Sequence, residues 1–111
     1  MNIEQLKQQN AAIRSVCSEI AELLTKKNTS YGGSVFEPVR IFSKLTAEDG
    51  IKVRLDDKLS RLLHGQGEFN EDTEFDLIGY LVLMRVARRV SLQGQLTKLA
   101  EQFTDPQNQA G

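Results

Sequence analysis

The sequence predicts an all-α fold, a small helical bundle with a long N-terminal heptad helix and a buried central helix. Apolar residues recur at intervals of three and four along most of the 111 positions, whereas no segment alternates as a strand would. The breaks in this pattern coincide with clusters of glycine, the residue type that most often ends helices. The length suits one core. We therefore expect a single helical domain over residues 1–104, followed by a polar tail at 105–111.

The first expected helix spans residues 3–27 and carries one narrow apolar seam. Its members are spaced by three and four, and they are Ile3, Leu6, Ile13, Cys17, Ile20 and Leu24, with the polar Asn10 in the remaining place. This is a heptad pattern, which suits either a helix packed on a partner chain or an ordinary bundle helix. Lys26 and Lys27 suit the helix end, and Asn28 is expected as a left-handed cap.

The middle of the chain predicts a loop and two further helices. Gly32 and Gly33 open the loop, and a short helix is expected at 38–45. Thr46, with Asp49 three residues later, predicts the start of a helix that runs to about 64 and ends at Gly65. One face of that helix is apolar, and another carries a continuous charged row of Arg54, Asp57, Lys58 and Arg61.

The last expected helix begins after Asn70, a plausible cap, and reaches about residue 90. Beyond a break near 91–94 it continues to about 103. Residues 77–84, LIGYLVLM, are apolar on every side, which predicts the buried central helix.

Composition excludes several classes of function. The formal net charge is −1, without the basic excess that a long nucleic acid requires, although a small anionic ligand remains possible. The single cysteine cannot form an intramolecular disulfide, which favours a reducing, cytoplasmic setting. The longest apolar run, 77–84, is far short of the roughly 20 residues that span a membrane. We expect no membrane and no long nucleic acid as partners.

A dense group of carboxylates at 68–76 is the strongest chemical signal. Glu68, Asp72 and Asp76 are spaced by four and would align on one helical face, where like charges repel. Asp76 lies beyond the first helical turn, so the helix dipole does not account for it. It requires a cation, which is either the row of Arg54, Lys58 and Arg61 or a divalent metal. The first gives a structural ion network; the second gives an Mg²⁺ site completed by a phosphate substrate.

Tyr31, between Ser30 and Gly32, also has two interpretations. The ring of a tyrosine in a glycine-bordered loop either stacks on a nucleotide base or closes over the core of the protein.

Three motifs taken in order carry a resemblance to a known family. They are Lys27-x3-Tyr31-Gly32, then Arg54-x2-Asp57-Lys58-x2-Arg61-Leu62, then Glu68-x3-Asp72-Thr73-x2-Asp76-Leu77-x2-Tyr80. Over about residues 27–85 the chain resembles the phage and prophage family called nucleotide modification associated domain 1. The resemblance implies a helical, phage-type nucleotide-handling protein, which would act in the host cell cytoplasm.

The resemblance and the charges together predict a ligand-binding protein. The ligand would be a nucleotide or a nucleotide-derived molecule, such as a precursor for modified DNA or a cyclic nucleotide signal that the protein sequesters. The expected ligand-binding residues are Lys27, Tyr31, Arg54, Asp57, Lys58, Arg61 and Asp76, and the expected metal ligands are Glu68, Asp72 and Asp76.

Two alternatives stay open. One is a Mg²⁺-dependent nucleotide phosphohydrolase related to the all-α NTP pyrophosphatases, although the helix at 46–64 lacks their paired glutamates. The other is an oligomeric helical interaction protein without a ligand. The narrow N-terminal seam makes a homo-oligomer the expected assembly under any of the three readings.

Overall fold

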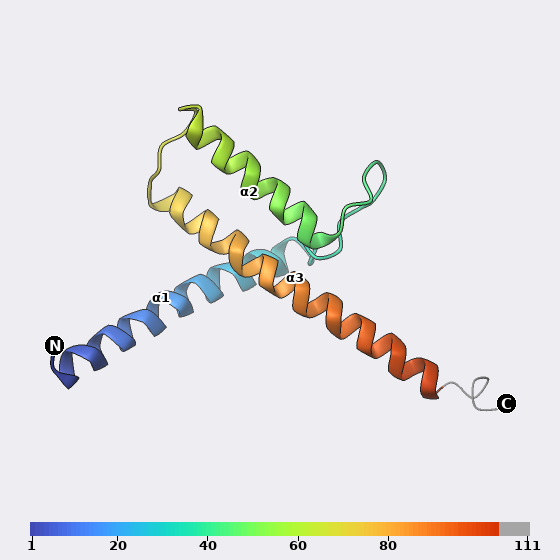
Figure 1. Cartoon of the computed structure of the whole chain (residues 1–111), viewed down its shortest axis with the longest axis horizontal. Helices are drawn as coiled ribbons and strands as arrows, with labels where there is room; N and C mark the ends of the chain where they lie inside the picture. The colour runs from blue at the N-terminus through green and yellow to red at the C-terminus, as the bar shows by residue number, and fades with distance from the viewer. Residues whose placement is uncertain (105–111) are drawn as a thin grey trace.

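The chain folds into three helices, which confirms the all-α prediction. They are α1 (Ile3–Ser30), α2 (Ala47–Leu63) and α3 (Glu71–Thr104). The computed structural model describes residues 1–104, so the predicted polar tail at 105–111 lies outside the described residues. In Figure 1, α2 lies beside the N-terminal half of α3, and α1 crosses α3 near its middle. The N-terminal part of α1 and the C-terminal part of α3 project away from this crossing.

The helix starts follow the predicted caps. The Thr46 hydroxyl accepts a hydrogen bond from the Asp49 backbone N–H at 3.1 Å, and Asn70 Oδ1 accepts one from Thr73 at 2.9 Å. Asn2 forms a reciprocal capping box with Gln5 at the start of α1. Each cap satisfies a backbone N–H that the first helical turn leaves without a carbonyl partner.

The end of α1 differs from the prediction. Asn28 is not a left-handed cap; the helix continues to Ser30, and the left-handed residues are Gly32 at φ 63° and Gly33 at φ 73°. The Gly33 N–H donates to the Asn28 carbonyl at 3.0 Å and the Gly32 N–H to the Thr29 carbonyl at 3.2 Å. These two bonds form a Schellman motif, for which glycine is favoured because it adopts positive φ without strain.

Two further predictions about helix boundaries were wrong. Residues 38–45 form no helix, and there Arg40 Nε donates to the Leu45 carbonyl while the Leu45 N–H donates to Ser43 Oγ. These local bonds give the backbone an alternative to a helical ladder. In addition, α3 has no break at 91–94, since one glycine among good helix formers costs only about 1 kcal/mol.

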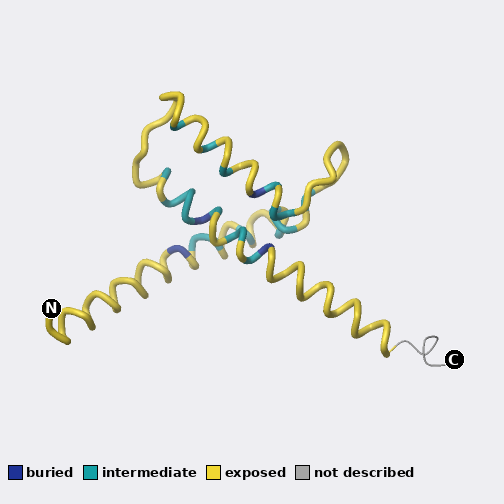
Figure 2. Tube along the Cα trace, in the orientation of Figure 1, coloured by how far each residue is buried: buried dark blue, intermediate teal, exposed yellow. Residues whose placement is uncertain are grey.

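The structure also corrects the predicted burial of the 77–84 stretch on every side. Leu81 and Val82, inside the 77–84 stretch, are 50% and 39% exposed. Figure 2 shows the buried and half-buried residues along the α2–α3 pair and where α1 crosses it, whereas the N-terminal part of α1 and the C-terminal part of α3 are exposed. Among the described residues only Ile20, Ile51 and Ala87 are buried hydrophobic side chains. Two other helices are too few to surround α3 within one chain.

Glycine also permits the crossing of α1 over α3. An added Cβ at Gly79 would lie 3.2 Å from Leu24 Cδ2, which is closer than most such contacts in proteins. Gly79 itself is buried. The missing side chain therefore lets the backbone of α3 approach the side chains of α1.

An ion pair links the start of α2 to α3. Arg88 Nε donates to Glu48 Oε1, and Lys52 Nζ lies 3.9 Å from the other carboxylate oxygen. The hydrogen bond from Arg88 is the main reason that the pKa of Glu48 is lower than its usual value. A carboxyl whose pKa falls on folding stabilises the fold above its unfolded pKa, and that stabilisation disappears as pH falls through the folded pKa.

We expect Glu48→Gln to lower the Tm slightly at neutral pH, because glutamine cannot form the ion pair. The difference from wild type should vanish as pH falls below the usual glutamate pKa of 4.5. Glu19→Gln is the control, since Glu19 has no ion pair within residues 1–104. Thermal melts across this pH range test the prediction, and a Tm deficit that persists in acid would contradict it.

Candidate functional site

A cavity of about 420 Å³ lies where the end of α1 meets α2 and α3. It falls within the 300–1,000 Å³ range typical of small-molecule sites. Its polar and aromatic lining comes from all three helices and from the loop after α1. The polar and aromatic lining residues include Lys27, Asn28, Tyr31, Arg54, Asp76 and Tyr80.

The end of α1 contributes one wall because of its helical register. Leu24, Asn28 and Tyr31 are spaced by four and three, so they share one face of the helix end, and all three line the cavity. Tyr31 is the C-terminal cap of α1 and is 69% exposed, so its ring borders the opening toward solvent. The Schellman turn at Gly32 and Gly33 then redirects the chain at this opening.

Asn28 brings an unusual polar atom to this wall. Its side-chain Oδ1 is buried and has no hydrogen-bond partner in the described part of the chain. An unsatisfied buried acceptor costs about 1–3 kcal/mol, so nearly all such atoms in folded proteins are paired. A ligand that donates an N–H or O–H at this point would satisfy it.

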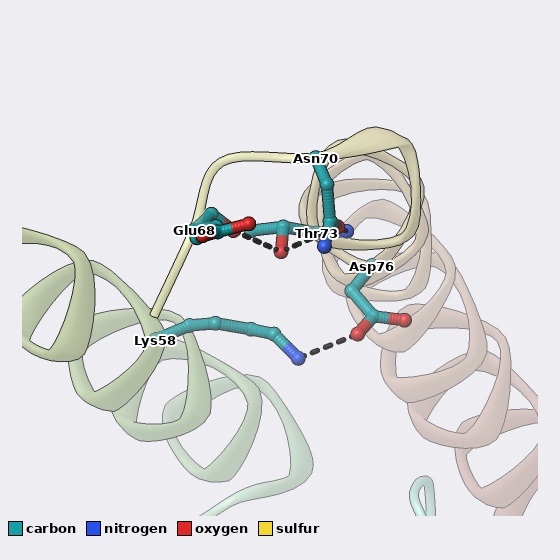
Figure 3. A network of polar contacts seen from close by, with 5 residues as sticks. All are labelled: Lys58, Glu68, Asn70, Thr73 and Asp76. Atoms are coloured by element: carbon teal, nitrogen blue, oxygen red, sulfur yellow. Dashed lines mark hydrogen bonds and ion pairs between the residues drawn. The ribbon is translucent and has the colours of Figure 1, made fainter. Parts of the chain in front are cut away.

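The opposite wall carries an ion pair between α2 and α3. Lys58 Nζ lies 2.5 Å from Asp76 Oδ2, and both side chains are partly buried. Figure 3 shows the Lys58 side chain of α2 extending toward Asp76 of α3. The sequence left two sources for the cation beside Asp76, the basic row of the second helix or a metal ion. In the structure, Lys58 of that row pairs with Asp76.

The connection before α3 is held close to this ion pair. The Thr73 hydroxyl lies 3.0 Å from the Glu68 backbone carbonyl oxygen and 3.1 Å from Asn70 Oδ1 (Figure 3). Glu68 therefore contributes its backbone to a turn, and these contacts fix the first turn of α3 in front of Asp76.

Two cations of the cavity have no counter-ion among the residues that the structure describes. Within residues 1–104, neither Lys27 nor Arg54 forms an ion pair or a side-chain hydrogen bond. Asp76 is the acidic lining residue, and its charge is already matched by Lys58. The cavity thus carries uncompensated positive charge, which favours an anionic ligand.

The predicted site residues divide into two groups. Lys27, Tyr31, Arg54 and Asp76 meet at the cavity, with Lys58 bonded to Asp76 from beside it. Asp57 and Arg61, and the expected metal ligands Glu68 and Asp72, are not among its lining residues. In the described part of the chain, no three acidic, histidine or cysteine side chains group closely enough to hold a metal ion.

Asn28 and Tyr80 are among the cavity residues that sequence reasoning missed. Asn28 was taken as a cap, although continuing the helical register past Leu24 would have put it on the same face. Tyr80 was part of the third motif but had no role assigned, and it is half-buried in the lining of the cavity. Its position one residue after Gly79, where α1 approaches α3, could not be read from spacing alone.

Comparisons with protein-family models, with curated proteins and with solved structures found no match for this chain. In the helices of the described residues, no segment is both long and apolar enough to cross a membrane.

Proposed function

We propose that this protein binds a nucleotide or a nucleotide-derived anion in the cavity between α1, α2 and α3. The observation that supports the proposal is the lining of this cavity, which contains two tyrosine rings and two cations. Within residues 1–104 these cations, Lys27 and Arg54, form no ion pair. Because no family model matches the chain, the proposal depends on this cavity and takes only secondary support from the resemblance of its three motifs.

The phosphate end of the ligand would contact the cations. Arg54 offers a planar, permanently charged guanidinium that donates two parallel hydrogen bonds to phosphate oxygens. Lys27 adds a second positive charge from α1. Asp76 would keep Lys58 away from the phosphate and so leave binding to the two unpaired cations.

The base end of the ligand would contact the aromatic residues and Asn28. Tyr31 and Tyr80 supply flat apolar surfaces, and stacking of a base on an aromatic ring contributes about 1–3 kcal/mol. Asn28 Oδ1 would accept a hydrogen bond from an N–H of the base or from a sugar hydroxyl. Each polar group that this cavity leaves unsatisfied would then have a partner in a nucleotide.

A nucleotide panel tests the proposal by thermal shift. Mono-, di- and triphosphates and cyclic di- and trinucleotides are compared with the corresponding nucleosides, each with and without Mg²⁺. We expect at least one phosphate-containing ligand to raise the Tm, since about 100 Kd of ligand stabilises a protein by about 2.7 kcal/mol. Nucleosides should have little effect because they offer no anion to Lys27 and Arg54.

The same samples separate binding from turnover. Mass spectrometry of each ligand after incubation is expected to recover it intact. Turnover that requires Mg²⁺ and is lost in Asp76→Asn would instead favour the phosphohydrolase. If neither nucleotides nor inorganic phosphate and pyrophosphate change the Tm, the cavity is not an anion site and the proposal is wrong.

A further inference from the structure

Within residues 1–104, the apolar face on the N-terminal part of α1 has no cover. We call Ile3, Leu6, Asn10, Ile13 and Cys17 the α1 seam. Ile3, Leu6 and Ile13 are 68%, 46% and 60% exposed, and Cys17 is exposed as well. Ile20 continues the same three-and-four spacing and is buried. One heptad stripe is therefore packed at one end of α1 and bare at the other.

The chain as a whole exposes more surface than a compact monomer would. The chain exposes 9380 Å², whereas a compact monomer of its mass would expose about 6,200 Å². Its radius of gyration is 19.6 Å, against about 13 Å expected for 111 residues in a compact domain. The excess, about 3,000 Å² per chain, is ample for an obligate protein–protein interface.

The residue types of the α1 seam identify the partner. Its spacing places Ile3, Asn10 and Cys17 at heptad position a, and Leu6 and Ile13 at position d. A lone asparagine at position a costs stability unless it faces another polar group, and in a parallel pair of identical helices it faces its own copy. We infer that a second copy of this chain covers the α1 seam, with the two helices parallel and in register.

The inferred pairing is independent of the nucleotide proposal and extends to the cysteine. In this register Cys17 faces Cys17 of the second copy. Facing position-a residues lie near enough for a disulfide, whose two Cα atoms are about 4.4–6.8 Å apart. An antiparallel pair centred on the seam would bring Cys17 to Ile3 instead. The chain's single cysteine thus reports both the partner and the direction of pairing.

Mass in solution and crosslinking test the inference on the wild-type chain. Size-exclusion chromatography with light scattering should give the mass of a dimer or a multiple of it, and the Tm should rise with protein concentration. Mild oxidation should convert the protein to a covalent dimer through Cys17, reversed by reductant and absent in Cys17→Ser. Neither readout requires a variant that disturbs the seam.

Paired variants locate the interface. Leu6→Glu with Ile13→Glu should reduce the assembly to lower mass, because it buries charge in the seam. Gln8→Glu with Ser15→Glu adds the same two charges seven residues apart on the opposite face of α1 and should leave the mass unchanged. For direction, both Cys17 and Asn10→Cys in the Cys17→Ser background should crosslink, whereas an antiparallel pair centred on the seam would crosslink only through position 10. Gln8→Cys in the same background should not crosslink.

Three results would overturn the inference. They are a monomeric mass at all concentrations, failure of Cys17 to crosslink in an oligomer, and Gln8→Cys crosslinking as efficiently as Cys17. Circular dichroism checks that the glutamate variants keep their helices. If they unfold, the wild-type mass and the Cys17 crosslink still decide the question.

Discussion

Replacing Arg54 with alanine is expected to weaken binding of the responsive nucleotide by about 10- to 100-fold while the protein remains folded. Hydrogen bonds to charged groups contribute about 1.5–3 kcal/mol each, which sets that range. Arg54 is exposed and makes no ion pair within residues 1–104, so its loss should leave the Tm of the free protein nearly unchanged. Isothermal titration calorimetry of wild type and variant measures the difference.

Arg61→Ala is the matched control for this experiment. Arg61 lies on the same helix and in the same charged row, two turns later, but it does not line the cavity. It should bind the nucleotide within about twofold of wild type, since at that distance solvent and salt screen most of its charge. Equal losses in the two variants would mean that the whole charged row attracts the ligand, and the cavity would lose its role as the site.

The aromatic half of the site can be examined in the same way. Tyr31→Phe keeps the ring and should retain stacking on a base, whereas Tyr31→Ala removes it. If only Tyr31→Ala loses affinity for the nucleotide, the ring stacks on the base. If Tyr31→Phe loses affinity as well, the hydroxyl forms a hydrogen bond with the ligand. Binding unaffected by either change would remove Tyr31 from the site.

Sequence periodicity predicted the helices because helix formation is largely a local property. Thr46 and Asn70 are strong capping residues, and both helix starts lie where these residues predict them. The end of α1 was placed too early because Asn28 is an acceptable left-handed cap by residue type. The neighbouring Gly32 and Gly33 adopt positive φ at lower cost, and the helix ends there.

The arrangement of the helices was only partly predictable. The sequence predicted a cation for Asp76, either from the row of Arg54, Lys58 and Arg61 or from a metal, and in the structure Lys58 of that row pairs with it. The approach of Lys27 and Tyr31 to Arg54 depends instead on α1 crossing α3 at Gly79, a long-range contact without a spacing signature. The 77–84 stretch, which is only partly buried, was misjudged because an apolar sequence does not reveal whether its cover comes from the same chain.

Replacing Ile51 with alanine is expected to destabilise the fold more than any other single truncation. Ile51 is 1% exposed and is the most deeply buried large side chain among the described residues, at the start of α2. Truncating a buried isoleucine to alanine typically costs about 2–5 kcal/mol, because it removes apolar contacts and leaves a cavity. A domain of this size is stable by about 5–15 kcal/mol, so the loss is a large share of the total.

Leu63→Ala provides the control, since it removes the same number of carbon atoms from a side chain on α2 that is 85% exposed. Its effect should be within about 0.5 kcal/mol of wild type, as for most surface substitutions. Urea unfolding followed by circular dichroism at one protein concentration measures both variants, because an oligomer's stability depends on concentration. Equal losses would place Leu63 in a buried contact with another chain and show that α2, as well as the α1 seam, is covered in the assembly.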